Sequence, residues 1–450
     1  MCINMINLKI IDSVTFEIIQ GKDLVKKILS YKAEYWKQGA YCKERIEYDK
    51  SFVTGKYCYN GFIPRIRKYC EDRNIPFACD GDIDIIKPVR KPKLKDIKFR
   101  DIQLESIKQI NDKQTGVINL STGIGKTIFA AGLISTYKNP KVLFICRSND
   151  LVNQAYETFN SFGFKCCKIG NGKKVIDSPI VCGTVQTYKN LDLIKYCSYF
   201  DILIVDEIHK GMNIGGQYEK VLSKVLAPIR VGLTGTIPKK IGNAMLIEGL
   251  IGEVVVKADT VYGIKENILM KPKIEYIIYP LAKSISKYST YKELYNHGIV
   301  ENTARNNAIC KEIKKEVEDK NSSIIFCVEI KHIENISRIL TEKGIIHKCV
   351  YGDIDVDERI KIKKDLINKK YYAVISSVVW VEGLDIPSLN CIFNISGGKS
   401  NEALLQKIGR VLRTSENKKE CKVYEVLDPG KYLADHTIKR LTVLKQNDII

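Results

Sequence analysis

The sequence lacks any long hydrophobic run. No stretch of 18 apolar residues occurs, and the first residues contain no basic segment followed by an apolar core. A membrane-spanning helix needs about 20 predominantly apolar residues, and a signal peptide needs that basic-then-apolar order. We therefore expect no membrane span and no secretory leader, and we expect a cytoplasmic location.

Cysteine spacings typical of metal sites are also missing. The chain has 15 cysteines but no CxxC pair, and its five histidines do not cluster with them. Cys42, Cys58, Cys70 and Cys79 share one region, at spacings unlike those of the common zinc modules. We expect free thiols, as is usual in a reducing compartment, and no structural metal.

Acidic residues are few relative to basic ones. Lys and Arg number 72 against 52 Asp and Glu, which gives a net charge of +20. This surplus is spread along the chain and favours a polyanionic partner, because each Lys or Arg near a phosphate releases a condensed counterion. Charge alone leaves open a basic protein that is merely soluble. The length of 450 residues suggests about three domains.

Residues 1–92 form a distinct region, for which we expect a small α+β accessory domain. The stretch Lys87–Lys98 contains Pro88, Pro92 and many charges, and it is typical of a linker. Aromatic residues among Lys and Arg could stack on nucleic-acid bases, although their commoner role is to fill the core of a small domain. Both roles can hold together. The aromatic residues are Tyr31, Tyr35, Trp36, Tyr41, Tyr48, Phe52, Tyr57, Tyr59 and Tyr69.

Short apolar runs, each followed by a helical pattern, recur along the rest of the chain. Such runs suit parallel strands buried on both faces of a sheet. They form two series that meet near residues 258–270, which predicts two successive α/β domains, residues 93–268 and 269–450. The first series is Gly116–Leu120, Val142–Cys146, Ile180–Cys182, Ile202–Val205 and Val231–Leu233. The second is Ile274–Tyr279, Ser323–Val328, His347–Val350, Ala373–Ser376, Cys391–Asn394 and Val423–Val426.

The loop Ser121–Thr127 (STGIGKT) separates the first predicted strand from a helical pattern. Glycines let backbone N–H groups close around phosphate oxygens, and the helix N-terminus adds its positive end. Lys126 would bind the β- and γ-phosphates of ATP, and the Thr127 hydroxyl would bind Mg²⁺. The strict P-loop pattern is not met, because Leu120 stands where the first glycine belongs. Gly123, within the loop, is an additional glycine.

An acidic pair follows the strand Ile202–Val205. Asp206, at the carboxyl end of that strand, would meet the Mg²⁺, and Glu207 could orient and deprotonate the attacking water. An acidic pair after a strand is weak evidence alone. Eighty residues after a matching phosphate loop, it predicts an ATP-hydrolysing site.

These motifs, with others in order over roughly residues 99–413, resemble those of the superfamily 2 helicases. The resemblance implies two tandem RecA-like domains and binding of ATP with Mg²⁺. Residues that would bind the nucleotide are Arg100 and Gln103 at the adenine, Thr122, Gly123, Gly125, Lys126 and Thr127 at the phosphates, and Gly383 and Asp385. Residues that would bind nucleic acid are Arg147, Thr184, Thr187, Gly352 and Ser377. Residues that would couple the domains are His209, Thr234, Thr236 and Gln406.

The segment Gln406–Arg413 fits the arginine-finger motif Q-x-x-G-R-x-x-R. A guanidinium can stabilise the charge that spreads over the γ-phosphate in the transition state. Arg410 and Arg413 are three residues apart, so we expect them to share one helix face and to act with Lys126, Asp206 and Glu207 in catalysis.

Within the superfamily, the small front domain and the short chain after the fingers resemble bacteriophage branch-migration helicases. For a viral protein the expected cytoplasm is that of the host. This resemblance favours DNA as partner, single-stranded and branched or forked, in recombination, repair or replication. A DNA-dependent ATPase that releases transcripts and an RNA helicase stay as alternatives. A non-catalytic scaffold would be expected to lose Lys126 or Glu207, and an ATPase acting on proteins would not need the strand-binding motifs. A monomer is compatible with the sequence, which does not fix the oligomeric state.

Overall fold

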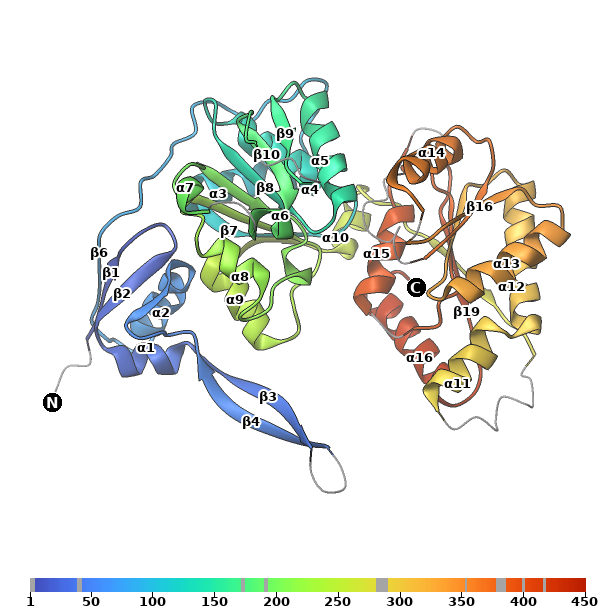
Figure 1. Cartoon of the computed structure of the whole chain (residues 1–450), viewed down its shortest axis with the longest axis horizontal. Coiled ribbons are helices and arrows are strands. Elements are labelled where there is room, and N and C mark those ends of the chain that lie inside the picture. The colour runs from blue at the N-terminus through green and yellow to red at the C-terminus, as the bar shows by residue number, and fades with distance from the viewer. Residues whose placement is uncertain are drawn as a thin grey trace. The chain divides into compact units, whose positions relative to one another are not determined.

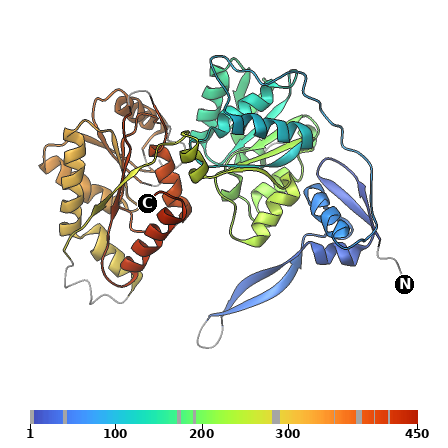
Figure 2. The same cartoon turned by 180° about the vertical axis from the view of Figure 1, so that it is seen from behind.

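A computed structural model describes residues 5–38, 43–170, 175–189, 193–280, 290–352, 354–377, 386–398, 401–415 and 418–450. Its internal contacts divide the chain into two compact units (Figures 1 and 2). The first comprises Met1–Leu120 and Gly125–Lys257, and the second comprises Ser121–Ile124 and Ala258–Ile450. Across the described ranges, no helix combines the length and apolarity needed to cross a membrane.

The chain begins with a small front domain built on a mixed four-stranded sheet of order β5-β2-β1-β6. Strand β1 pairs antiparallel with β2 and parallel with β6, so the predicted α+β character is confirmed. Its strands are β1 (Ile6–Ile10), β2 (Thr15–Gln20), β5 (Tyr57–Tyr59) and β6 (Phe77–Asp80), and its helices are α1 (Lys22–Ile28), α2 (Ile63–Glu71) and the short η1 (Asn60–Phe62). The core residues include Leu8, Phe16, Val25, Phe62 and Ile66.

A long antiparallel hairpin, β3 (Ser30–Gln38) and β4 (Lys43–Ser51), extends from the front domain (Figure 1). The expectation that the aromatic residues fill the small core is wrong for Tyr48 and Tyr57, which are exposed, and correct for Phe52. Aliphatic and Phe side chains fill the core instead, since they carry no hydroxyl that needs a buried partner. Tyr41 and the side chains of Tyr35 and Trp36 lie outside the described residues, and Tyr69 is half-buried.

The first α/β domain has a seven-stranded sheet of order β13-β7-β12-β11-β8-β10-β9, and its central pairs are parallel. The strands predicted at Val142–Cys146 (β8) and Ile202–Val205 (β11) are confirmed at those bounds. The others are β7 (Thr115–Leu120), β9 (Cys166–Lys168), β10 (Ile180–Thr184), β12 (Ile229–Thr234) and β13 (Val254–Ala258). The helices are α3 (Asp101–Lys113), α4 (Lys126–Ser135), α5 (Asn149–Ser161), α6 (Val185–Lys189), α7 (Leu193–Tyr196), α8 (Gln217–Leu222) and α9 (Ile241–Ile251).

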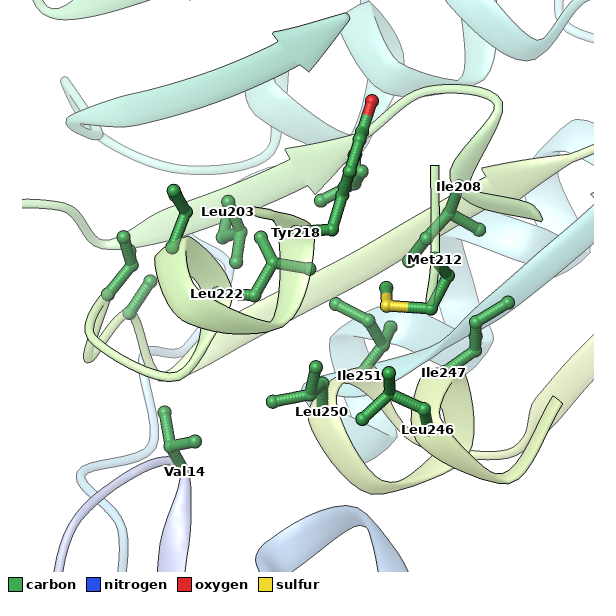
Figure 3. Close-up of a cluster of buried hydrophobic side chains, with 14 of the residues drawn as sticks. Val14, Leu203, Ile208, Met212, Tyr218, Leu222, Leu246, Ile247, Leu250 and Ile251 are labelled. Atoms are coloured by element: carbon green, nitrogen blue, oxygen red, sulfur yellow. The ribbon is translucent and has the colours of Figure 1, made fainter. Parts of the chain in front are cut away.

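The front domain packs directly on α9. The guanidinium of Arg65 forms two hydrogen bonds to the Glu248 carboxylate, of 2.7 and 2.5 Å. A Cβ at Gly61 would collide with the carbonyl oxygen of Glu248, and a Cβ at Gly249 would come within 2.6 Å of the Phe62 ring. One hydrophobic cluster contains residues of both domains, among them Val14 of the front domain and Leu246, Leu250 and Ile251 on α9 (Figure 3).

The predicted linker Lys87–Lys98 contains neither helix nor strand, as expected. It is nevertheless attached to the first α/β domain at the C-terminal end of α4. Arg90 donates from Nε to the Ser135 carbonyl at 2.7 Å and from Nη2 to the Tyr137 carbonyl at 3.1 Å. The front domain therefore forms one compact unit with the domain that follows it.

The second α/β domain has a six-stranded sheet of order β14-β19-β18-β15-β17-β16, in which every neighbouring pair is parallel. The two parallel sheets confirm the predicted tandem RecA-like architecture. Its strands are β14 (Lys273–Ile277), β15 (Ser323–Phe326), β16 (His347–Val350), β17 (Ala373–Ser376), β18 (Cys391–Asn394) and β19 (Lys422–Val426). Its helices are α10 (Thr260–Lys265), α11 (Tyr291–Tyr295), the π-helical turn Asn296–Val300, α12 (Thr303–Glu318), α13 (Ile330–Glu342), α14 (Val356–Ile367), α15 (Asn401–Val411) and α16 (Lys431–Gln446).

A buried ion pair lies within this second domain. Arg305 on α12 and Asp428, just after β19, are 2.7 Å apart and both almost fully buried. Strand β19 and helix α16 follow the finger motif, so the description of the chain as ending soon after it is wrong: these elements complete the sheet and its core.

Candidate active site

The predicted site residues follow the carboxyl ends of parallel strands. Lys126 comes after β7, Asp206 and Glu207 after β11, and Thr234 ends β12. Carboxyl ends of parallel strands meet at one edge of a sheet, where ligands of open α/β folds bind. The parallel pairing β7-β12-β11 therefore gathers these residues at one edge.

The phosphate loop turns through two glycines with left-handed backbone angles, Gly123 at φ +92° and Gly125 at φ +104°. A Cβ at Gly125 would also collide with the side-chain amide of Gln103. Helix α4 begins at Lys126, and no side chain caps its N-terminus, so its first N–H groups are oriented for an anion. This loop has the backbone that a phosphate cradle requires.

Lys126 and Glu207 form an ion pair beneath the loop, with Nζ 3.2 Å from Oε1. Lys126 also donates to the carbonyl of Leu120 at 3.3 Å, the position where the strict pattern has glycine. Burial alone would raise the pKa of Glu207, but the charges of Lys126, His209 and Lys210 outweigh it and lower the pKa to about 2. Glu207 is therefore a carboxylate throughout the neutral range.

A chain of contacts runs from this ion pair to the end of β12. Oε2 of Glu207 lies 3.4 Å from Nδ1 of the buried His209, which lies 2.7 Å from the Thr234 hydroxyl. That hydroxyl donates to the Thr236 carbonyl at 2.5 Å and accepts from the Thr236 N–H at 3.2 Å. Glu207 has a left-handed backbone, φ +47°, which is strained for a residue with a side chain. The structure thus brings the predicted coupling residues of the first domain together.

Oxygen donors at the site suit Mg²⁺ with a nucleotide. Thr127 offers a hydroxyl and Asp206 a carboxylate, which are ligands that Mg²⁺ prefers, and this ion commonly takes only one or two carboxylates beside substrate phosphates. The Glu207 N–H donates to Oδ1 of Asp206 at 3.0 Å and orients that carboxylate. Among the described residues, no cluster of three His, Cys, Asp or Glu could hold a metal ion by itself. The thirteen described cysteines are free thiols.

Gln103 is tied to the phosphate loop. Its amide donates from Nε2 to the Gly125 carbonyl at 3.3 Å and accepts at Oε1 from the Arg100 N–H at 3.0 Å. Burial lowers the pKa of Arg100. The two residues predicted to read adenine therefore stand next to the loop, at the start of α3.

The residues predicted to bind nucleic acid in the first domain follow β8 and β10. Thr184 and Thr187 hydroxyls are 3.1 Å apart, and the Thr187 N–H donates to the Thr184 hydroxyl at 3.4 Å. Arg147 is exposed and precedes α5, whose N-cap is Ser148. These side chains lie along neighbouring strand ends, as backbone-binding groups would.

In the second domain, Gly352 and Ser377 follow the neighbouring strands β16 and β17. Arg359 on α14 donates to the Gly352 carbonyl at 2.9 Å, and the Ser377 N–H donates to the Val350 carbonyl at 2.9 Å. Gly383, Asp385 and the side chain of Gln406 lie outside the described residues.

The expectation that Arg410 and Arg413 share a helix face is wrong. Helix α15 ends at Val411, so Arg413 lies beyond it, in an isolated bridge with Leu269. The Met270 N–H donates a hydrogen bond to the Leu412 carbonyl at 2.7 Å, and the chain leaves the helix at this point. Arg410 is thus carried by a helix, and Arg413 by extended chain.

Two lysines beside the fingers were not predicted as functional. Lys407 lies inside the finger motif and Lys418 follows it, and both are buried. Lys407 could have been noticed as a charge on the inward side of an amphipathic helix. Nothing in the local sequence marks Lys418, because its partners are backbone carbonyls.

Comparison with known proteins matches two family models. Residues 96–239 match the model described as type III restriction enzyme, res subunit, and residues 304–415 match the helicase conserved C-terminal domain. The probable helicase D10 of Escherichia phage T5 is 26% identical over 94% of this chain and 95% of its own length. The ATP-dependent DNA helicase uvsW of Enterobacteria phage T4 is 27% identical over 69% of this chain and 65% of its own length.

Among solved structures, Dbp5 of S. cerevisiae bound to RNA and ADP BeF3 aligns with a TM-score of 0.56 at 15% identity. The alignment covers 78% of this chain and 92% of that one. At that identity the likeness shows the fold alone. With the family models, the phage relatives and the motif order taken together, the chain belongs to the superfamily 2 helicases and resembles those of bacteriophages.

Proposed function

We propose that this helicase is an ATP-driven DNA translocase that remodels branched DNA, such as forks and four-way junctions, in recombination, repair or replication. The observation that carries the motor function is the continuous chain of contacts Lys126–Glu207–His209–Thr234. It links the phosphate loop to the carboxyl end of the neighbouring strand β12. The likeness to uvsW of phage T4, an ATP-dependent DNA helicase, supports DNA as the partner, and the net charge of +20 supports a polyanion.

ATP binding would rearrange the ion pair beneath the loop. The phosphates of ATP compete with Glu207 for Lys126, so the carboxylate is released when the lysine turns to the β- and γ-phosphates. Glu207 can then orient a water and take its proton. Mg²⁺, held through Thr127 and Asp206, would neutralise phosphate charge. Arg410 and Arg413 would supply the guanidinium groups on closure of the two domains.

The contact between His209 and Thr234 would couple a change in the position of Glu207 to strand displacement. Replacing Thr234 with Ala removes the 2.7 Å contact and leaves Lys126, Asp206 and Glu207 in place. We expect strand displacement to fall by about tenfold, the upper end for one lost hydrogen bond, while DNA-stimulated ATP hydrolysis stays within about twofold. Gel-based strand displacement and a phosphate-release assay measure the two rates.

The exposed Thr442 on α16 offers a matched control, since Thr442→Ala should change neither rate. A parallel loss of both activities in Thr234→Ala would show that the threonine supports hydrolysis itself and would remove the coupling role.

ATP hydrolysis should depend on the nucleic acid supplied. The purified chain is assayed alone and with single-stranded DNA, duplex, fork, four-way junction and RNA, with Lys126→Ala as the inactive control. We expect forks and junctions to stimulate most. Best stimulation by RNA would assign the protein to RNA helicases, stimulation by duplex alone would favour the transcript-releasing ATPases, and equal rates throughout would reject the motor.

A further inference from the structure

Lys407 fixes the helix that carries Arg410. The residue is 5% exposed, and its ammonium donates to Oδ1 of Asn394 at 2.9 Å and to the Ser396 hydroxyl at 2.7 Å. It also stands 5.5 Å from the centre of the Phe326 ring. Lys407 precedes Arg410 by three residues, less than one helical turn. Its attachment to the end of β18 therefore sets the rotation of α15 about its own axis.

The acceptors of Lys407 are themselves held. Asn394 donates from its amide to Oε1 of Glu425 at 2.7 Å, and Oε2 of Glu425 is 2.8 Å from Nε of Arg440 on α16. The network is buried throughout and connects α15, β18, β19 and α16. A satisfied network of this kind is rigid and specifies one arrangement of the elements that it joins.

Lys418 fixes the chain where the helix ends. Its ammonium donates to the carbonyl of Val411, the last residue of α15, and to the carbonyl of Arg413 at 2.9 Å. The last carbonyls of a helix have no partner within it, and a cation there also suits the helix dipole. Lys418 thus holds the backbone on both sides of Leu412, from which Arg413 extends.

Burying two ammonium groups is unfavourable for folding. Burial lowers the pKa of Lys407 to about 8 and that of Lys418 to about 8. Apolar side chains such as Met would fill the same volume without that desolvation cost. Lys407 anchors the helix that carries Arg410 to the end of β18, and Lys418 binds the backbone on either side of Leu412, so both charges act on the geometry of the segment that carries the two arginines.

We propose that Lys407 and Lys418 are positioning residues that hold Arg410 and Arg413 for ATP hydrolysis. The inference rests on the proposed role of these arginines as fingers. Because fingers act on the transition state, loss of either lysine lowers kcat and leaves the KM for ATP almost unchanged.

The test compares Lys407→Met and Lys418→Met with Lys419→Met, a change at the exposed neighbour, in the full-length protein with a saturating DNA fork. We expect kcat to fall by about 10- to 100-fold in the first two, the range for a reacting group displaced by about 1 Å, with KM within about twofold. The Lys419→Met variant should match wild type.

Wild-type kcat in both lysine variants would overturn the inference. So would a rise in KM that accounts for the whole loss. Arg410→Ala distinguishes a failure of the finger role from a failure of the positioning role. If this variant hydrolyses ATP normally, the finger role itself is wrong. If a Met variant does not fold, Ser396→Ala carries the test, since it removes one acceptor of Lys407 and keeps the charge. We expect its kcat to fall by about threefold, and no change would overturn the role of Lys407.

Discussion

Replacing Glu207 with Gln is expected to lower kcat for ATP hydrolysis by about 10²- to 10⁴-fold, the usual contribution of a general base. ATP should bind as tightly as in wild type or more tightly, because Glu207 no longer competes with the phosphates for Lys126, from which it now lies 3.2 Å away. Phosphate release gives kcat, and titration with a fluorescent ATP analogue gives the affinity.

The exposed Glu253 provides the matched carboxylate control. Glu253→Gln removes an ion pair with Lys113 on the surface and should leave both quantities unchanged. Glu207 has a pKa of about 2 in the folded chain against an ordinary value of 4.5. Its ion pair therefore contributes stability above about pH 4.5, and this is lost as the pH falls toward 2. At neutral pH, Glu207 is ionised in the wild type, so an assay there measures the loss of kcat. Hydrolysis at the wild-type rate would place the base elsewhere.

Replacing Asp428 with Ala is expected to destabilise the second domain by about 3–5 kcal/mol, the usual result of leaving one partner of a buried pair without its counter-charge. Arg305 is fully buried and bonds Asp428 at 2.7 Å, and the Tyr279 hydroxyl donates to the same oxygen at 3.1 Å. Urea unfolding, followed by a probe placed in the second domain, measures the change.

A surface pair gives the contrast. Lys314 and Glu318, 3.6 Å apart on the exposed face of α12, should contribute less than about 0.5 kcal/mol, so Glu318→Ala should be nearly neutral. The double variant Arg305→Met with Asp428→Leu should recover part of the loss, because no charge is left unpaired. A change below about 1 kcal/mol for Asp428→Ala would show that water reaches Arg305.

The sequence could predict the central strands because each is buried on both faces and reads as an apolar run. Two edge strands of the first sheet were missed: β9 has only three residues, and β13 is partly exposed, whereas the edge strands β14 and β16 of the second sheet were predicted. The site could be predicted as a cluster because parallel strands bring their carboxyl ends together. Its roles in nucleotide and DNA binding stay predictions.

Other features depend on partners far apart in the chain. The left-handed conformation of Glu207, the end of α15 at Val411 and the capping of that end by Lys418 arise from contacts that no local pattern encodes. The prediction that tyrosines fill the core of the front domain failed for Tyr48 and Tyr57, because aromatic content alone does not show whether Phe and Leu side chains already occupy that core. At Val411, contacts between residues far apart in the chain determine where the helix ends.

The close packing of the front domain on α9 has a consequence for how such proteins can be shortened or recombined. A chain that starts at residue 93 would uncover the α9 surface that now packs against Phe62 and Tyr59, and it would leave Glu248 without Arg65. Such a fragment would be prone to aggregation. We expect an exchange of front domains between relatives to succeed only if α9 is exchanged with them. Gly61 of the front domain lies against the backbone of Glu248 on α9, and Gly249 on α9 lies against the Phe62 ring of the front domain. The front domain and α9 thus form one packing module that is interrupted in sequence.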